Sequence, residues 1–206
     1  DRTSVQLQEL NLGATAVGTG LNAGDDYTAI AIGHLGKLTA LTLMPAANRF
    51  RVTQSMGDVL SYSGGMRRLA VELSKIASDL RLLSSGPRAG LAEIRLPAVQ
   101  PGSSIMPGKV NPSIPEMVNQ VCYQVLGFDL TIAVASEAGQ LELNVMMPVI
   151  AWNALHASRI LREAMTSLRA KCVEGIVANE ARARELLDRS TAVATALSPH
   201  IGYAAT

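Results

Sequence analysis

The segment 102–112 gathers the residues of this sequence that are best suited to chemistry. It reads Gly-Ser-Ser-Ile-Met-Pro-Gly-Lys-Val-Asn-Pro. Ser103 and Ser104 supply two hydroxyls, and Lys109 supplies a positive charge. Asn111 can both donate and accept hydrogen bonds. The glycines let backbone N–H groups approach a ligand, and a helix starting here would add unpaired N–H groups with a partial positive charge. These features predict a site for a small carboxylate or phosphate, with a hydroxyl held beside it.

A hydroxyl in such a site can act as a general base if its surroundings lower its pKa. A plainer interpretation is that the segment only caps the next helix, with its serines satisfying backbone groups. Serine and glycine fill most turns, so composition favours neither interpretation over the other. The residue types alone therefore leave both open.

Other chemical motifs fit the sequence less well. A P-loop has four residues between its first glycine and Gly-Lys, followed by Ser or Thr. Here five residues separate Gly102 from Gly108, and Val110 follows the lysine. Residues 18–23 have the letters GxGxxA of a dinucleotide site, but they follow a helical pattern and lack the acidic residue of a βαβ unit. A Ser-Lys hydrolase stays open, although it normally needs an oxyanion site and a closer pattern.

The remaining chemistry-bearing residues give no sign of a metal site. The three histidines are isolated, and none has Asp, Glu or Cys at ligand spacing. Cys122 and Cys172 lie in apolar helical patterns without a CxxC motif. They predict buried, reduced thiols and a cytoplasmic setting. The residue pattern therefore predicts no metal site.

Long helices must position the segment 102–112. Between residues 53 and 83 apolar side chains recur at spacings of three and four, which lines one helix face. Ser113 and Glu116 have the spacing of a capping box, so a second helix is predicted to start there, with a pattern that can extend to Leu143. Residues 84–112 hold five of the nine prolines and form the longest irregular stretch, which is typical of a functional loop. Further helices are predicted near 1–12, 27–43, 148–175 and 179–188.

Composition supports a globular, all-α, long-helix bundle. Hydrophobic residues make up 48% of the 206 residues but aromatic residues only 3%, which favours packed helices over sheets. A formal net charge of +1 gives no global field for nucleic acid or an acidic membrane. No apolar stretch reaches the roughly 18 residues that a membrane span needs. We therefore expect neither nucleic acid nor a membrane as a partner.

The segment 102–112 resembles the signature sequence of the aspartase/fumarase superfamily. The resemblance covers nearly the whole chain, because residues 11–22 are similar to a helix-breaking segment of that family and residues 81–91 to its approach to the signature. Residues 118–122 and 137–146 are more similar to the aspartases than to the fumarases.

The resemblance implies a fold, an activity and an assembly. Residues 1–206 would form the C-terminal half of the family's central helical domain, with a signature loop at 97–112. The implied reaction is reversible deamination of L-aspartate to fumarate and ammonia, with neither a metal nor an organic cofactor. The alternatives are a fumarate hydratase and a non-catalytic helical fragment. The implied assembly is a homotetramer with active sites built from three subunits.

The resemblance also implies roles for single residues. Ser103 would take the C3 proton of the substrate and so form an aci-carboxylate intermediate. The residues implied to bind substrate are Ser104, Met106, Lys109 and Asn111. Glu116 matches a position that orients an active-site histidine in fumarase relatives, besides its predicted capping role.

The sequence also departs from the family pattern. Phe128 and Met147 stand where aspartases usually carry other residues. Family members are longer, and we expect their N-terminal domain, two substrate-binding segments and small C-terminal domain to be absent from this chain. The 206-residue chain alone is therefore expected to be inactive.

Overall fold

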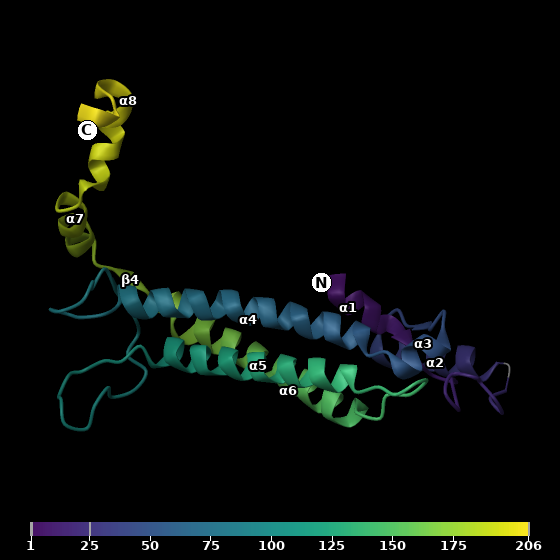
Figure 1. The fold of residues 1–206 in the computed structure, drawn as a ribbon. Coiled ribbons are helices and arrows are strands. Elements are labelled where there is room, and N and C mark those ends of the chain that lie inside the picture. The colour runs from purple at the N-terminus through teal and green to yellow at the C-terminus, as the bar shows by residue number, and fades with distance from the viewer. Residues whose placement is uncertain (1, 25, 206) are drawn as a thin grey trace. The chain divides into compact units, whose positions relative to one another are not determined.

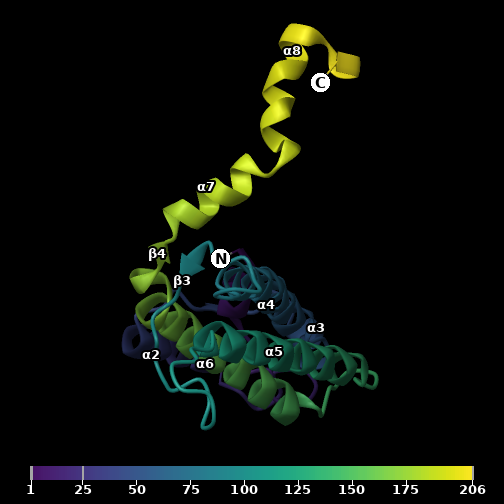
Figure 2. The same cartoon turned by 90° about the vertical axis from the view of Figure 1, so that its left-hand side faces the viewer.

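The computed structural model describes residues 2–24 and 26–205 and is dominated by three long helices. These are α4 (Gly57–Leu83), α5 (Ser113–Glu137) and α6 (Met147–Lys171), shown in Figures 1 and 2. The expected all-α, long-helix class is confirmed. The short helices are α1 (Arg2–Val5), η1 (Gln6–Gln8), α2 (Tyr27–Thr39), α3 (Arg49–Gln54), η2 (Val173–Gly175), α7 (Glu180–Asp188), η3 (Thr191–Leu197), α8 (Ser198–Ile201) and η4 (Tyr203–Ala205).

Four two-residue strands join distant parts of the chain. β1 (Glu9–Leu10) pairs in parallel with β2 (Met44–Pro45). β3 (Ile94–Arg95) pairs antiparallel with β4 (Val177–Ala178). The first pairing explains why the helix predicted over residues 1–12 is wrong beyond its first turns, since the backbone becomes extended there to reach β2.

The end of α5 also differs from the sequence pattern. The helix stops at Glu137 rather than continuing towards Leu143. The buried side chain of Asn144 donates hydrogen bonds to the carbonyl oxygens of Ala135 (3.0 Å) and Ser136 (3.2 Å). Because these carbonyls lie in the last turn, a side chain from beyond the helix replaces the next turn and ends it.

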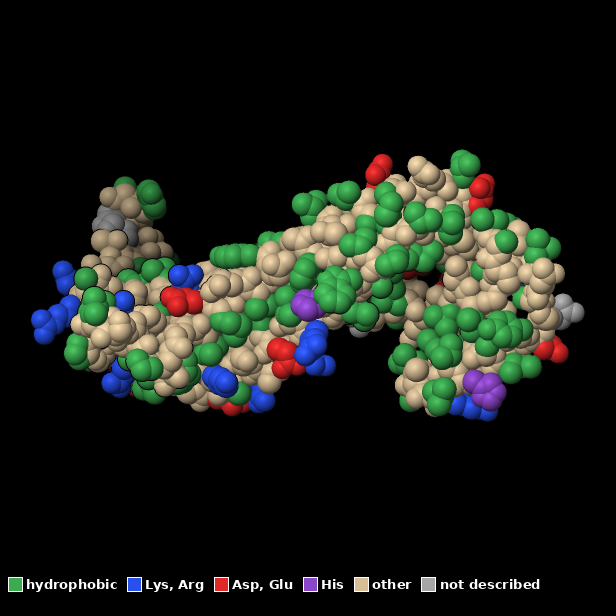
Figure 3. All heavy atoms as spheres, turned by 90° about the horizontal axis from the view of Figure 1, so that it is seen from below, with side chains coloured by type: hydrophobic (Ala, Val, Ile, Leu, Met, Phe, Trp, Pro, Cys, Tyr) green, Lys and Arg blue, Asp and Glu red, His purple; other side chains and the backbone are tan. Residues whose placement is uncertain are grey.

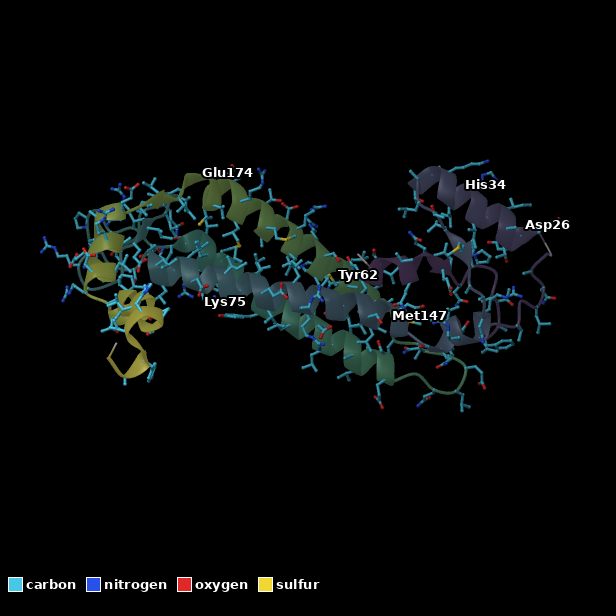
Figure 4. The ribbon with its side chains drawn as sticks, turned by 90° about the horizontal axis from the view of Figure 1, so that it is seen from above. Asp26, His34, Tyr62, Lys75, Met147 and Glu174 are labelled. Atoms are coloured by element: carbon cyan, nitrogen blue, oxygen red, sulfur yellow. The ribbon has the colours of Figure 1, made fainter. Side chains whose placement is uncertain are left out.

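The chain divides into two compact units. The first comprises residues 1–72 and 121–162. In it, Ile132 and Ala135 of α5 form a core with Ile150 and Ala154 of α6. The Tyr62 hydroxyl of α4 lies 3.0 Å from Ser158 Oγ of α6 (Figure 4). Packing of apolar helix faces, joined by a few polar contacts, therefore holds this unit together.

A buried carboxylate ties α4 to α5 in the first unit. Asp129 has a side chain that is only 5% exposed. It accepts a hydrogen bond of 2.6 Å from Ser63 Oγ and forms an ion pair with Arg67, whose Nη1 lies 3.0 Å from Asp129 Oδ2. A buried charge is tolerated only when it is paired and hydrogen-bonded, so both partners stabilise the helix contact.

The change Arg67→Met is expected to lower the free energy of unfolding by about 1–2 kcal/mol, because Asp129 would keep only its serine partner. The arginine side chain is 60% exposed, and solvent screening keeps the loss below that of a fully buried pair. Its neighbour gives a matched control, since Arg68 is 85% exposed and lies 3.9 Å from Glu72. Arg68→Met should change stability by less than about 0.5 kcal/mol in urea unfolding. Equal effects of the two changes would contradict the role given to Asp129.

The second unit comprises residues 73–120 and 163–206. Its helices α4 and α5 are joined by the buried side chain of Asn119. The amide of Asn119 donates to the carbonyl oxygen of Ser74 at 2.9 Å, and its oxygen accepts from Arg81 Nη1 at 3.1 Å. This contact fixes the end of α4 against the start of α5, and the irregular segment 84–112 runs between those two points.

The predicted state of the cysteines is confirmed in part. Cys122 and Cys172 are buried and unpaired, and burial raises the pKa of both thiols. Among the helices of the described residues, none is long and apolar enough to cross a membrane. Apolar side chains nevertheless remain at the surface, as the green areas of Figure 3 show. Exposed examples on α5 and α6 are Leu130, Val134, Trp152 and Leu155.

Candidate functional site

Hydrogen bonds close the predicted site segment into a loop at its base. The Gly102 N–H donates to the Lys109 carbonyl oxygen at 2.9 Å, and Asn111 Nδ2 donates to the Gly102 carbonyl oxygen at 2.8 Å. A Cβ at position 102 would lie 2.4 Å from the Lys109 oxygen. Glycine is therefore required at position 102, because the two ends of the loop approach each other closely there. Asn111, predicted to bind substrate, uses its amide N–H group to hold the loop together.

The Ser103 hydroxyl is the best-placed reactive group in the loop. Its oxygen accepts hydrogen bonds from the backbone N–H groups of Ile105 and Met106, each at 3.2 Å. Donors that point at an oxygen stabilise its charged form and lower its pKa. An alkoxide at this position, the form that a general base requires, would keep the same two donors.

Two hollows flank the loop. The first, of about 430 Å³, is lined by Ser103, Met106 and Lys109 together with residues 98–101. The second, of about 410 Å³, is lined by Lys109 and Asn111 together with part of the approach segment, residues 84–96. Lys109 is exposed and borders both. Ser103 and Lys109 thus line the same hollow.

Two predicted site residues lie outside these hollows. Ser104 is exposed and lines neither of them. Glu116 lies half-buried in the first turn of α5 and also lines neither. The expected capping box does not form, because the Ser113 hydroxyl accepts from Gln100 Nε2 at 2.9 Å while the Glu116 N–H donates to the Pro112 carbonyl at 3.0 Å. Proline in the preceding turn supplies the acceptor that the serine was expected to provide.

The sequence analysis did not identify Asn179 as a lining residue. This side chain borders the second hollow from the start of α7. Asparagine before a helix is usually interpreted as a cap, so its residue type pointed to a local role. Within the described residues no group of three or more His, Cys, Asp or Glu could hold a metal ion.

The chain resembles known proteins over most of its length. Residues 2–127 match the family described as Lyase. An aspartate ammonia-lyase from Pseudomonas fluorescens is 56% identical over 96% of this chain and 41% of its own. The chain thus spans about two fifths of the length of that relative.

Solved structures show the same helical arrangement. A fumarate lyase from Brucella melitensis, solved with cobalt bound, is 54% identical and superposes with a TM-score of 0.92, covering 98% of this chain and 44% of its own. A class II fumarase from Schistosoma mansoni is 38% identical with the same TM-score of 0.92, covering 98% and 46%. These structures therefore resemble the chain in both fold and sequence.

Proposed function

Because the chain belongs to the aspartase/fumarase superfamily of lyases, we propose that the complete gene product removes ammonia reversibly from L-aspartate to give fumarate. A relative named aspartate ammonia-lyase is 56% identical to this chain, which favours aspartate over malate as the substrate. In this proposal residues 1–206 are the C-terminal half of the central helical domain. The signature loop 97–112 then contributes one part of an active site.

The proposed mechanism begins with proton transfer to Ser103. Its alkoxide oxygen takes a proton from C3 of aspartate, and the electron pair of the broken C–H bond moves into the neighbouring carboxylate. This gives an aci-carboxylate with two negative charges on its oxygens. The electrons then return to form the C2–C3 double bond while the C–N bond breaks, and the amine, already protonated as an ammonium group, leaves as ammonia. Fumarate remains.

The charge that develops in the intermediate needs donors already in place. Lys109 borders the hollow that Ser103 faces and is suited to bind a substrate carboxylate. Asn111 keeps its amide oxygen and its place beside Lys109, while its N–H group holds the loop closed. Met106 lines the first hollow as an apolar wall. Ser104 and free backbone N–H groups would bind the second carboxylate after the loop closes over the substrate.

One observation carries the proposal. The Ser103 oxygen receives two backbone N–H bonds in the hollow that Lys109 borders. Bonds from the N–H groups two and three residues further on also occur in a serine that only caps a turn, so the feature that favours a catalytic role is the Lys109 side chain lining the same hollow. We also propose that Glu116 orients a catalytic group supplied by another segment, since its half-buried carboxylate starts the helix that follows the loop.

The substrate can be tested with the complete gene product. L-aspartate and L-malate are supplied separately, and fumarate is followed by its ultraviolet absorbance. We expect fumarate from L-aspartate. Fumarate from L-malate alone would make the protein a hydratase, and no product from either would favour a non-catalytic helical scaffold.

We further propose that the protein is a homo-oligomer, and a tetramer by analogy with the superfamily. Exposed apolar side chains on α5 and α6, including Leu130 and Trp152, leave surface that a monomer rarely shows. An apolar hollow of about 450 Å³, lined in part by Leu130, lies in this surface and could receive a side chain of a second copy. Light scattering during gel filtration measures the mass, and a monomer at micromolar concentration would contradict the proposal.

A further inference from the structure

The residues that follow α6 hold the signature loop at its start. A Cβ at Gly175 would lie 2.5 Å from Cγ of Pro97, so glycine lets the backbone after α6 contact the first residues of the loop. Next along the chain, β4 pairs with β3. The Asn179 N–H then donates to the Glu93 carbonyl oxygen at 2.8 Å. Residues 175–179 thus contact the approach segment and the loop one after another.

Two side chains of the same region extend this contact. Asn179 precedes α7, but its side chain makes no bond to its own helix and instead donates to the Ala92 carbonyl oxygen at 2.9 Å. Arg182 donates through Nε to the Leu91 carbonyl oxygen at 3.0 Å and through Nη2 to that of Gly90 at 3.4 Å. Hydrogen bonds to a charged donor are the stronger kind, so the backbone of residues 90–92 is held firmly.

The approach segment can pass this restraint on because it is folded tightly on itself. The Ala92 N–H donates to the Ser85 carbonyl oxygen at 2.7 Å, and the Leu91 N–H donates to Ser85 Oγ at 3.1 Å. A Cβ at Gly90 would lie 2.4 Å from the Ser85 carbonyl carbon. Because the segment is bonded to itself in this way, we expect a restraint on residues 90–92 to act on all of it, and only residues 97–101 separate it from Gly102.

The second hollow connects this segment to the proposed site. Ala92, Arg95 and Asn179 line it together with Lys109 and Asn111. A shift of the approach segment would therefore change the space around the Lys109 and Asn111 side chains.

We propose that Asn179 and Arg182 are positioning residues, which hold the approach segment so that Lys109 and Asn111 stand where a carboxylate binds. This inference rests on the proposed function and adds residues to it that do not touch substrate. Glu185 supports the arrangement, since it pairs with Arg182 at 2.8 Å. Hydrogen bonding and attraction from Arg182, together with Arg189, hold the pKa of the Glu185 carboxyl below its usual value.

Arg182→Gln in the complete gene product tests the proposal, because it removes the charge and the geometry of the donor pair. Amide hydrogen exchange of residues 102–110 is expected to become about tenfold faster than in the wild type, which corresponds to losing about 1.4 kcal/mol of local stability. The KM for L-aspartate should rise by a similar factor while kcat changes by less than about threefold. The reason is that the loop adopts its binding-competent position in a smaller fraction of the molecules.

A matched control lies directly after the same helix. Arg189 also pairs with Glu185, at 3.2 Å, and is 73% exposed. Arg189→Gln should leave both exchange and KM at wild-type values. Arg182→Lys keeps the charge and one donor and should restore part of the KM. Gly175→Ala loosens the same contact from the Pro97 side, so it provides a test if Arg182→Gln does not fold.

Each outcome decides the proposal. Unchanged exchange at 102–110 and unchanged KM in folded Arg182→Gln and Gly175→Ala variants would overturn it and leave these residues a stabilising role only. If the wild type forms no fumarate, the proposed function fails. The exchange measurement still shows whether residues 175–182 hold the loop.

Discussion

Ser103→Ala is expected to lower kcat for fumarate formation by about three orders of magnitude while fumarate still binds. A positioned general base typically contributes a factor of about 10²–10⁴, and no other hydroxyl in the loop receives two backbone N–H bonds among the described residues. Because the change removes only one oxygen atom, the hydrogen bonds of Gly102 and Asn111 that close the loop should persist. Steady-state kinetics give kcat, and fumarate titration gives affinity.

The neighbouring serine is the control for this prediction. Ser104 is exposed and lies outside both hollows. If it only helps to bind the substrate, Ser104→Ala should raise KM and keep kcat within about tenfold of the wild type. A Ser103→Ala protein that keeps most of its turnover would remove Ser103 from the role of base.

Lys109→Met is expected to weaken fumarate binding by about 2 kcal/mol, or roughly thirty-fold, because a carboxylate would lose its charged partner. Methionine is about as long as lysine and replaces its apolar methylene stem, so the lining of both hollows should persist. The effect should appear in the dissociation constant for fumarate, measured by calorimetry, and in KM for L-aspartate. Raising the salt concentration should weaken wild-type binding more than that of the variant.

Lys75 provides a charge-matched control. This lysine lies on α4, is 73% exposed and pairs with Asp79 (Figure 4). Lys75→Met removes the same charge without touching either hollow and should leave fumarate affinity unchanged within about twofold. Equal losses from both lysine changes would mean that the effect is one of net charge, and the specific role of Lys109 would be wrong.

Much of the fold could be predicted from periodicity. The spacing of apolar residues predicted α4 and α6 closely, and the start of α5 at Ser113 was placed correctly. The end of α5 was not, because Asn144 caps it from beyond the helix and a one-dimensional pattern does not reveal such a contact. The extended residues of β1 were missed for the same reason, since their partner β2 lies far along the chain.

The site was predictable in its residue types and only partly in its geometry. The residue types of the loop predicted a carboxylate site with a hydroxyl beside it, which stays a prediction, and the structure places Ser103 and Lys109 in the lining of one hollow. The two N–H bonds to Ser103 depend on the path of an irregular backbone, which residue types do not specify. Asn179 and Arg182 were read as parts of an ordinary helix, because a side chain that bonds to a distant carbonyl leaves no local pattern.

The most direct test of the central claim is deuterium incorporation at C3 of L-aspartate. The complete gene product is incubated with L-aspartate, fumarate and ammonia in deuterated water, and the aspartate is analysed by NMR. Every route to deuterium at C3 passes through the base that removes or delivers that hydrogen. We predict incorporation at one of the two C3 positions with the wild type and incorporation slower by about three orders of magnitude with Ser103→Ala, which should still bind fumarate. Wild-type rates of incorporation in Ser103→Ala would show that another group is the base and would contradict the account.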